Sequence, residues 1–294
     1  MPCCTRSRGG QPGCGPIDPY GEDAQDYARA TALVPTSCED ETVRILGALR
    51  SGTRHFPEDG PDAFFNAEQN ALIARNAERY YRTMIRGGSA SWNVRDHHMM
   101  ETLDRLVAHH GPQCRAIIWE HNTHVGDARF TDMARHGMVN VGQLVRERHG
   151  ERRNDRDGVV LVGFGTHRGT VIASSEWGAP MERMQVPEAR GGTWEDLLHE
   201  AVGGDGLFVF EGSDDGGDDG GDDGGIPGLD QPLGHRAIGV VYRSGVESWG
   251  NYVPTIVPRR YDAFVFIDES RAVDPLQMPV TGNAELPETF PSGM

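Results

Sequence analysis

The chain has 294 residues, of which 37% are hydrophobic and 39 are glycine, enough for one large α/β domain or two smaller ones. Its net charge of −16 argues against nucleic acid as a partner, because phosphate contacts require a basic face. All the basic residues are arginine, and the five cysteines, an odd number, predict no disulfide framework. No apolar run could span a bilayer and no apolar signal segment opens the chain, so we expect a soluble, cytoplasmic protein without a membrane partner.

Both ends of the chain and one internal segment have the composition of unpacked polypeptide. Residues 1–17 are rich in Gly, Pro, Arg and Cys and predict a disordered tail, and residues 279–294 are assigned to a C-terminal tail. Within about 211–230 the sequence Asp-Asp-Gly-Gly repeats. Its carboxylates suggest calcium, but the spacing fits neither an EF-hand nor a β-roll, so we expect a flexible acidic insertion. The α/β domain is therefore predicted over residues 18–278.

Apolar residues recurring at spacings of three and four predict most of the helices. We expect helices at 37–52, at 68–85 and, capped by Asn93, at 93–111. Two more are indicated by capping pairs, namely Asn140 with Gln143 before a helix to Gly150, and Thr193 with Asp196 before a short helix.

Short apolar runs between these helices predict buried strands. They lie at 116–119, 159–164, 170–173, 207–210, 237–242 and 263–267. The runs at 159–164 and 170–173 are expected to form a hairpin across Gly165–Gly169. Helices that alternate with buried strands indicate an α/β fold with a mostly parallel central sheet flanked by helices.

The sequence changes abruptly from apolar to polar after Trp119, which is where we expect the chemistry. Ligand sites in open α/β sheets lie beyond the carboxyl ends of the strands. His121 and His124 are candidate catalytic residues, because a neutral imidazole can take a proton from water near pH 7. The candidates for orienting the base or binding the substrate are Glu120, Asn122, Asp127, Arg129 and, from the helix at 93–111, Arg95.

Structural roles can explain the same residues. One histidine can hydrogen-bond a loop carbonyl while the other faces solvent. Asp127 can cap the turn that follows it or pair with Arg129. Two histidines can also bind a metal ion, but no third ligand is evident nearby, so neither a metal nor another cofactor is predicted.

Residues 119–129, Trp-Glu-His-Asn-Thr-His-Val-Gly-Asp-Ala-Arg, followed by Asn-Val-Gly-Gln at 140–143, resemble the erythromycin esterase family. The resemblance runs from about Pro19 to Leu276. It is specific because many separate segments fall in the same order. These further segments are 70–71, 77–81, 92–96 with Met99, 162–166, 236–242 and 264–268.

The resemblance implies an α/β hydrolase unrelated to the serine esterases. Members open macrolide lactones with a histidine-activated water and no covalent intermediate, which favours His121 as the base and His124 as its support. The family also carries an earlier half with a Gly-Glu-x-x-His-Gly motif that has no counterpart in this sequence. The domain is therefore expected to be incomplete relative to the full family domain.

Three functions stay open at this point. The first is a hydrolase acting on a small-molecule ester. The second is a non-catalytic fragment, or a subunit that needs a complementary chain or upstream half-domain. The third is a metal-dependent hydrolase built on His121 and His124.

Overall fold

The computed structural model describes residues 39–51, 60–84, 88–150, 158–176, 179–210 and 230–274. The predictions for both chain ends and for nearly all of the acidic insertion fall outside these residues. The chain divides into two compact units, residues 1–116 and 117–294. Within the described part of the chain, no helix has the length and apolar character needed to cross a membrane.

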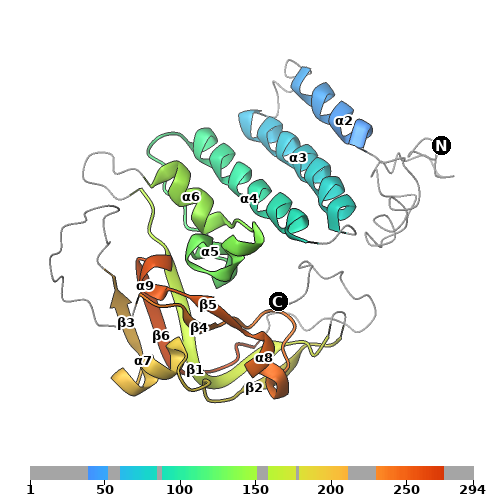
Figure 1. Cartoon of the computed structure of the whole chain (residues 1–294). Helices are drawn as coiled ribbons and strands as arrows, with labels where there is room; N and C mark the ends of the chain where they lie inside the picture. The colour runs from blue at the N-terminus through green and yellow to red at the C-terminus, as the bar shows by residue number, and fades with distance from the viewer. Residues whose placement is uncertain are drawn as a thin grey trace. The chain divides into compact units, whose positions relative to one another are not determined.

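Three helices form the described part of the first unit: α2 (Glu39–Ser51), α3 (Gly60–Met84) and α4 (Ser89–His110). Helix α3 packs against both α2 and α4 (Figure 1). All three helices were expected from the apolar spacing, although Asn93 is not the cap. Helix α4 begins at Ser89, directly after Gly88, so Asn93 lies inside it.

The second unit holds the strands. Its elements, in chain order, are α5 (Asn122–Val125), η3 (Ala128–Phe130), η4 (Asp132–His136), α6 (Val141–His149), β1 (Val162–Ala173), β2 (Glu182–Val186), α7 (Trp194–Val202), β3 (Gly206–Val209), β4 (Leu233–Arg236), η5 (Ser244–Val246), α8 (Glu247–Gly250), β5 (Tyr252–Thr255), α9 (Val257–Arg260) and β6 (Ala263–Ser270).

The main sheet has the strand order β2-β1-β6-β3 (Figure 1), and β4 pairs with β5 in a separate two-stranded sheet. Strands β1 and β6 are parallel, whereas β1–β2 and β3–β6 are antiparallel. The α/β class is therefore confirmed. The expected parallel arrangement holds only for the β1–β6 pair, so the sheet is mixed.

The predicted hairpin at 159–173 is wrong. Residues 162–173 form one continuous strand, β1, and its hairpin partner is β2. The glycines that suggested a turn instead allow close packing: a Cβ at Gly163 or Gly165 would lie within 2.9 Å of the Phe264 ring.

Two further strand predictions are wrong. Residues 116–119 form no strand, and Ile117 and Trp119 are 94% and 83% exposed. Residues 237–242 contribute only an isolated bridge between Val241 and Ser174, while the strand lies just before them, at β4. The strands expected near 207–210 and 263–267 are present as β3 and β6.

The two faces of the main sheet differ in how they are covered. On one face, Trp194 and Leu198 of α7 pack with Phe264 and Phe266 of β6 in the main core cluster. On the other face, the side chains of β3 remain 67% exposed at Leu207 and 71% exposed at Val209. Phe164 belongs to the same face, because it and Leu207 both pair in register with Val265.

Candidate functional site

The ring of His121 is held at both nitrogens by the protein. His121 caps the single turn α5, and its Nδ1 accepts a hydrogen bond from the backbone N–H of Thr123 (3.2 Å) and lies 2.9 Å from the Thr123 hydroxyl. Its Nε2 lies 2.9 Å from the carbonyl oxygen of Ile238. Since a carbonyl can only accept, Nε2 carries the ring proton and Nδ1 holds the lone pair.

The surroundings of His121 favour the neutral imidazole. The side chain is exposed on one side, yet the protein packed around the rest of the ring removes hydration and lowers the pKa of His121 to about 4. The hydrogen bond to Ile238 opposes this shift, whereas electrostatic repulsion from Arg260, and from His124 and His235 in their protonated forms, adds to it. The ring is therefore neutral at physiological pH.

The side chain of Asn122 hydrogen-bonds the loop after Trp119 to the edge of β1. Its Nδ2 donates to the carbonyl oxygen of Phe164 (2.5 Å), and its Oδ1 accepts from the backbone N–H of the same residue (3.1 Å). The carboxamide thus pairs with the strand as a neighbouring strand would. The carbonyl of Asn122 in turn accepts from the guanidinium of Arg260 (2.8 Å).

Asp127 and Arg129 form the ion pair that the sequence allowed. Asp127 is fully buried and accepts from the backbone N–H and the guanidinium of Arg129, at 2.7 Å in the shortest contact. Arg146 of α6 donates to the same carboxylate (3.3 Å). Asp127 also caps η3. Its oxygens are therefore committed to protein donors, while 45% of the Arg129 side chain stays exposed.

The other predicted site residues lie near the loop or on another element. Glu120 and His124 are half-buried on either side of His121 in sequence. Arg95 belongs to the first unit, where its guanidinium lies 4.9 Å from the centre of the Trp92 ring. A pocket of about 360 Å³ between α3 and α4 is lined by His97 and His98 but not by Arg95.

Sequence reasoning missed a buried pair beneath the loop. His235 of β4 and Glu195 of α7 are 1% and 0% exposed, and His235 Nδ1 lies 2.6 Å from a Glu195 carboxylate oxygen. On its other side, His235 Nε2 lies 3.3 Å from Nδ2 of Asn122. In the sequence, His235 stands out only as a histidine next to Arg236 in a short segment that begins with Leu and Gly. This local pattern does not identify Glu195 or Asn122 as its partners.

The described residues offer no ready metal centre. No three His, Cys, Asp or Glu side chains in that part of the chain converge so that they could hold a metal ion. His121 Nδ1 and Nε2 both face backbone groups, as described above.

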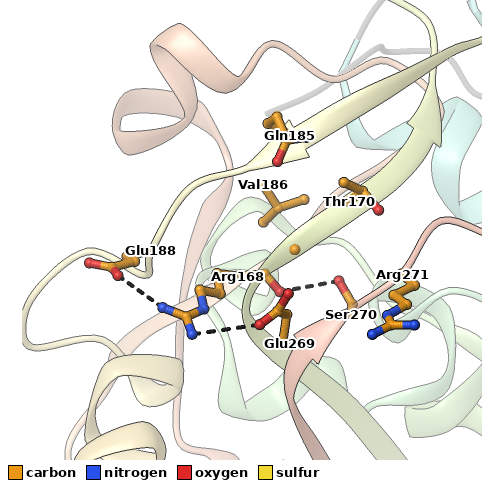
Figure 2. A pocket seen from close by; sticks show the side chains of 9 residues that line it. Arg168, Thr170, Gln185, Val186, Glu188, Glu269, Ser270 and Arg271 are labelled. Atoms are coloured by element: carbon orange, nitrogen blue, oxygen red, sulfur yellow. Dashed lines mark hydrogen bonds and ion pairs between the residues drawn. The ribbon is translucent and has the colours of Figure 1, made fainter.

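The pocket in Figure 2, about 370 Å³, lies where β1, β2 and the end of β6 come together, and its lining residues include no histidine. Arg168 pairs with two acidic residues of the lining, at 3.2 Å from Glu188 and 3.6 Å from Glu269. Arg168 pairs in register with Glu269, and it lies four residues from Phe164 along β1. The pocket is therefore the polar end of the exposed sheet face.

Comparison with solved structures shows the fold. The chain is similar to a succinoglycan biosynthesis protein with a TM-score of 0.57 and 14% identity, over 87% of this chain and 55% of that one. It is also similar to a Bacillus cereus protein with a TM-score of 0.59 and 13% identity, over 86% of this chain and 56% of that one. The chain thus spans little more than half the length of these two proteins.

Comparison with models of protein families identifies the family of the chain. The model of the family described as "Erythromycin esterase" matches residues 11–270. This range contains the loop at His121, both members of the buried Glu195–His235 pair and every strand of the main sheet. The chain therefore belongs to the erythromycin esterase family.

Proposed function

We propose that this chain is an erythromycin esterase-like hydrolase in which His121 activates a water molecule for attack on an ester or macrolactone. The observation that carries the proposal is the state of the imidazole. The ring is neutral near pH 7, its proton is held at Nε2 by the Ile238 carbonyl, and its lone pair at Nδ1 lies on an exposed loop.

The reaction begins when a water molecule displaces both the Thr123 hydroxyl and the Thr123 backbone N–H from Nδ1. The water transfers a proton to Nδ1 while its oxygen forms a bond to the carbonyl carbon of the ester. The tetrahedral intermediate then collapses, the bond to the alkoxide breaks, and the alkoxide takes the proton from Nδ1. His121 returns to its starting state, and no covalent enzyme intermediate forms.

Neighbouring groups supply charge and position. The exposed part of the Arg129 guanidinium stabilises the developing oxyanion, a role worth roughly a hundredfold or more per donor in other enzymes. Asp127 orients Arg129 through their ion pair. Asn122 holds His121 against the sheet edge, and His124 supports the loop one turn later.

The test compares hydrolysis of a macrolide and of a simple aryl ester by the wild-type chain and by His121→Ala. A matched control is His136→Ala, another exposed histidine whose ring contacts a backbone carbonyl, that of Asp132 (3.0 Å). Loss of a general base is expected to reduce kcat by about 10²–10⁴-fold, and the control is expected to keep its rate. Equal rates for wild type and His121→Ala would remove His121 from the mechanism. Loss of activity on chelation would favour the metal-dependent alternative.

A second candidate function is a subunit that works only with a complementary chain or half-domain. The exposed apolar face of the main sheet favours it, because contiguous exposed apolar patches mark sites of protein–protein interaction. Trp119, which is also exposed, extends the apolar surface, with its ring 5.7 Å from that of Phe164.

This candidate is tested by adding a polypeptide that carries the Gly-Glu-x-x-His-Gly motif and measuring complex formation and hydrolysis. Leu207→Arg is expected to weaken the complex. Val202→Arg, on α7 away from the exposed face, serves as the control because Val202 is also exposed, at 45%. Full activity of the chain alone, unchanged by the added polypeptide, would contradict this candidate.

A further inference from the structure

We infer that the buried Glu195–His235 pair positions His121 by fixing the orientation of the Asn122 carboxamide. Neither member of the pair can meet a substrate, because both are almost completely buried. They are therefore positioning residues rather than catalytic ones. The inference rests on the proposed function for its biological meaning, but the structural link from Glu195 to His121 can be measured without any activity.

The first step is the tautomer of His235. Its Nδ1 lies 2.6 Å from Oε1 of Glu195, and the backbone N–H of Arg236 donates to the same oxygen (2.9 Å). A carboxylate accepts hydrogen bonds, so the ring proton of His235 sits on Nδ1. The lone pair is consequently at Nε2, on the side of the ring that faces the loop.

The second step is the orientation of Asn122. Its Nδ2 donates to the carbonyl of Phe164 and lies 3.3 Å from Nε2 of His235, which can accept from it. If the proton of His235 moved to Nε2, two donors would face each other. The phenol of Tyr261, 3.5 Å from Nε2, is the other polar neighbour on this side. Glu195 therefore keeps the carboxamide in the orientation that pairs with β1.

The third step is the link from Asn122 to His121. The two residues are adjacent in the chain, and both are held by the same distant segment. His235 contacts Asn122, and Ile238, three residues further on, accepts the Nε2–H of His121. If Asn122 shifts from the edge of β1, the imidazole is displaced from the Ile238 carbonyl. The ring then gains solvent and loses its fixed tautomer.

The measurement is the titration and tautomer of the His121 ring by NMR of the full chain labelled with ¹⁵N-histidine. The His121→Ala spectrum identifies the signal among the 12 histidines. In the wild type, the pKa is expected near 4 with the proton on Nε2. In Glu195→Met, which removes the acceptor, the pKa is expected to rise toward the ordinary value near 6.5.

Three further variants make the result decisive. Glu195→Gln retains an acceptor oxygen for His235 and is expected to restore most of the wild-type signal. The double variant Glu195→Met/His235→Phe replaces the pair with apolar side chains of similar volume, a change that buried pairs often tolerate. It keeps the test open if Glu195→Met does not fold, and the same rise is expected. Glu200→Met, an exposed position on α7, should leave the pKa near 4.

Folded Glu195→Met or double variants in which His121 still titrates near 4 from the Nε2–H tautomer would overturn the inference. A shifted His121 signal in a chain that hydrolyses no ester would uphold the inference and count against the proposed function. An unshifted signal in a chain whose hydrolysis depends on His121 would do the reverse.

Discussion

Replacing Asp127 by Asn tests whether the loop after His121 depends on a buried charge. The carboxylate is fully buried and accepts from Arg129 and Arg146. Asparagine has the same shape, and its single oxygen can keep the bond from the backbone N–H of Arg129. The negative charge and the second acceptor are lost, so that an NH₂ group faces a guanidinium.

The expected loss in the free energy of unfolding depends on the interactions that Arg129 and Arg146 retain in the variant. Breaking a fully buried pair costs about 3–5 kcal/mol because the remaining charge has no partner. Here Arg129 can turn to water, and Arg146 retains Asp262 at 2.7 Å. The expected loss is therefore about 2–3 kcal/mol, which is the cost of removing one hydrogen bond to a charged group and leaving its buried partner unsatisfied.

Urea unfolding followed by circular dichroism measures this loss as a change in the free energy of unfolding. Glu147→Gln is the matched control, because Glu147 is an exposed acid on α6 that accepts a hydrogen bond from Gln143 (2.9 Å). It should change the free energy by no more than about 0.5 kcal/mol. If Asp127→Asn costs as little as the control, the ion pairs around Asp127 do not stabilise the loop.

Three further predictions concern pH and packing. If the neutral His121 ring is the base, kcat/KM should stay level from pH 8 down to about 5 and fall only as the pH approaches 4, whereas a fall centred near 6.5 would show an ordinary imidazole. The His121 ring binds a proton near pH 6.5 in the unfolded chain but only near pH 4 in the folded chain. His121 should therefore lower the stability of the fold as the pH falls from 6.5 to 4. The measurement is the urea midpoint, which should fall more in the wild type than in His121→Ala. Gly142→Ala should cost about 1–3 kcal/mol in the same unfolding assay, because its Cβ would lie 2.2 Å from the Val125 carbonyl oxygen. Gly47→Ala in α2, where nothing lies within 4 Å, should be neutral or stabilising, and equal costs for the two glycines would contradict the close contact of α6 with the loop.

The parts of the fold that depend on local pattern could be predicted from the sequence. The spacing of small and apolar residues gave α3, and Asn140 caps α6 as expected, accepting from the backbone N–H of Gln143 at 3.0 Å. The glycines of β1 were misinterpreted because glycine serves both tight turns and close packing. Only the position of the Phe264 ring, about 100 residues away, decides between the two.

The strand expected at 116–119 failed for a related reason. An apolar run predicts a strand only when something covers it, and neither Ile117 nor Trp119 is covered within the described residues. At the edge of β1 next to this segment, the carboxamide of Asn122 occupies the hydrogen-bonding groups of Phe164. Residues 116–119 are apolar, but Ile117 and Trp119 are not buried, and a buried strand requires that burial.

The site shows most clearly what a local reading leaves out. The polar residues after Trp119 were visible in the sequence because they are contiguous, and the turn α5 that they form has only four residues. A turn of that length is not stable alone, since helix nucleation is unfavourable. It is held by Asn140, which donates to the carbonyls of Thr123 and Gly126, and by contacts from Phe164, Ile238 and Arg260.

Those contacts come from segments up to 138 residues away in the chain. The same amino acids in a short peptide would present an imidazole with free rotation, two accessible nitrogens and a pKa near 6.5. The lowered pKa and the fixed tautomer of His121 are thus properties of the folded second unit rather than of the His-x-x-His motif. For this reason the family motif alone does not establish a base, and substitutions at buried positions far from the loop can alter the histidine as directly as changes beside it.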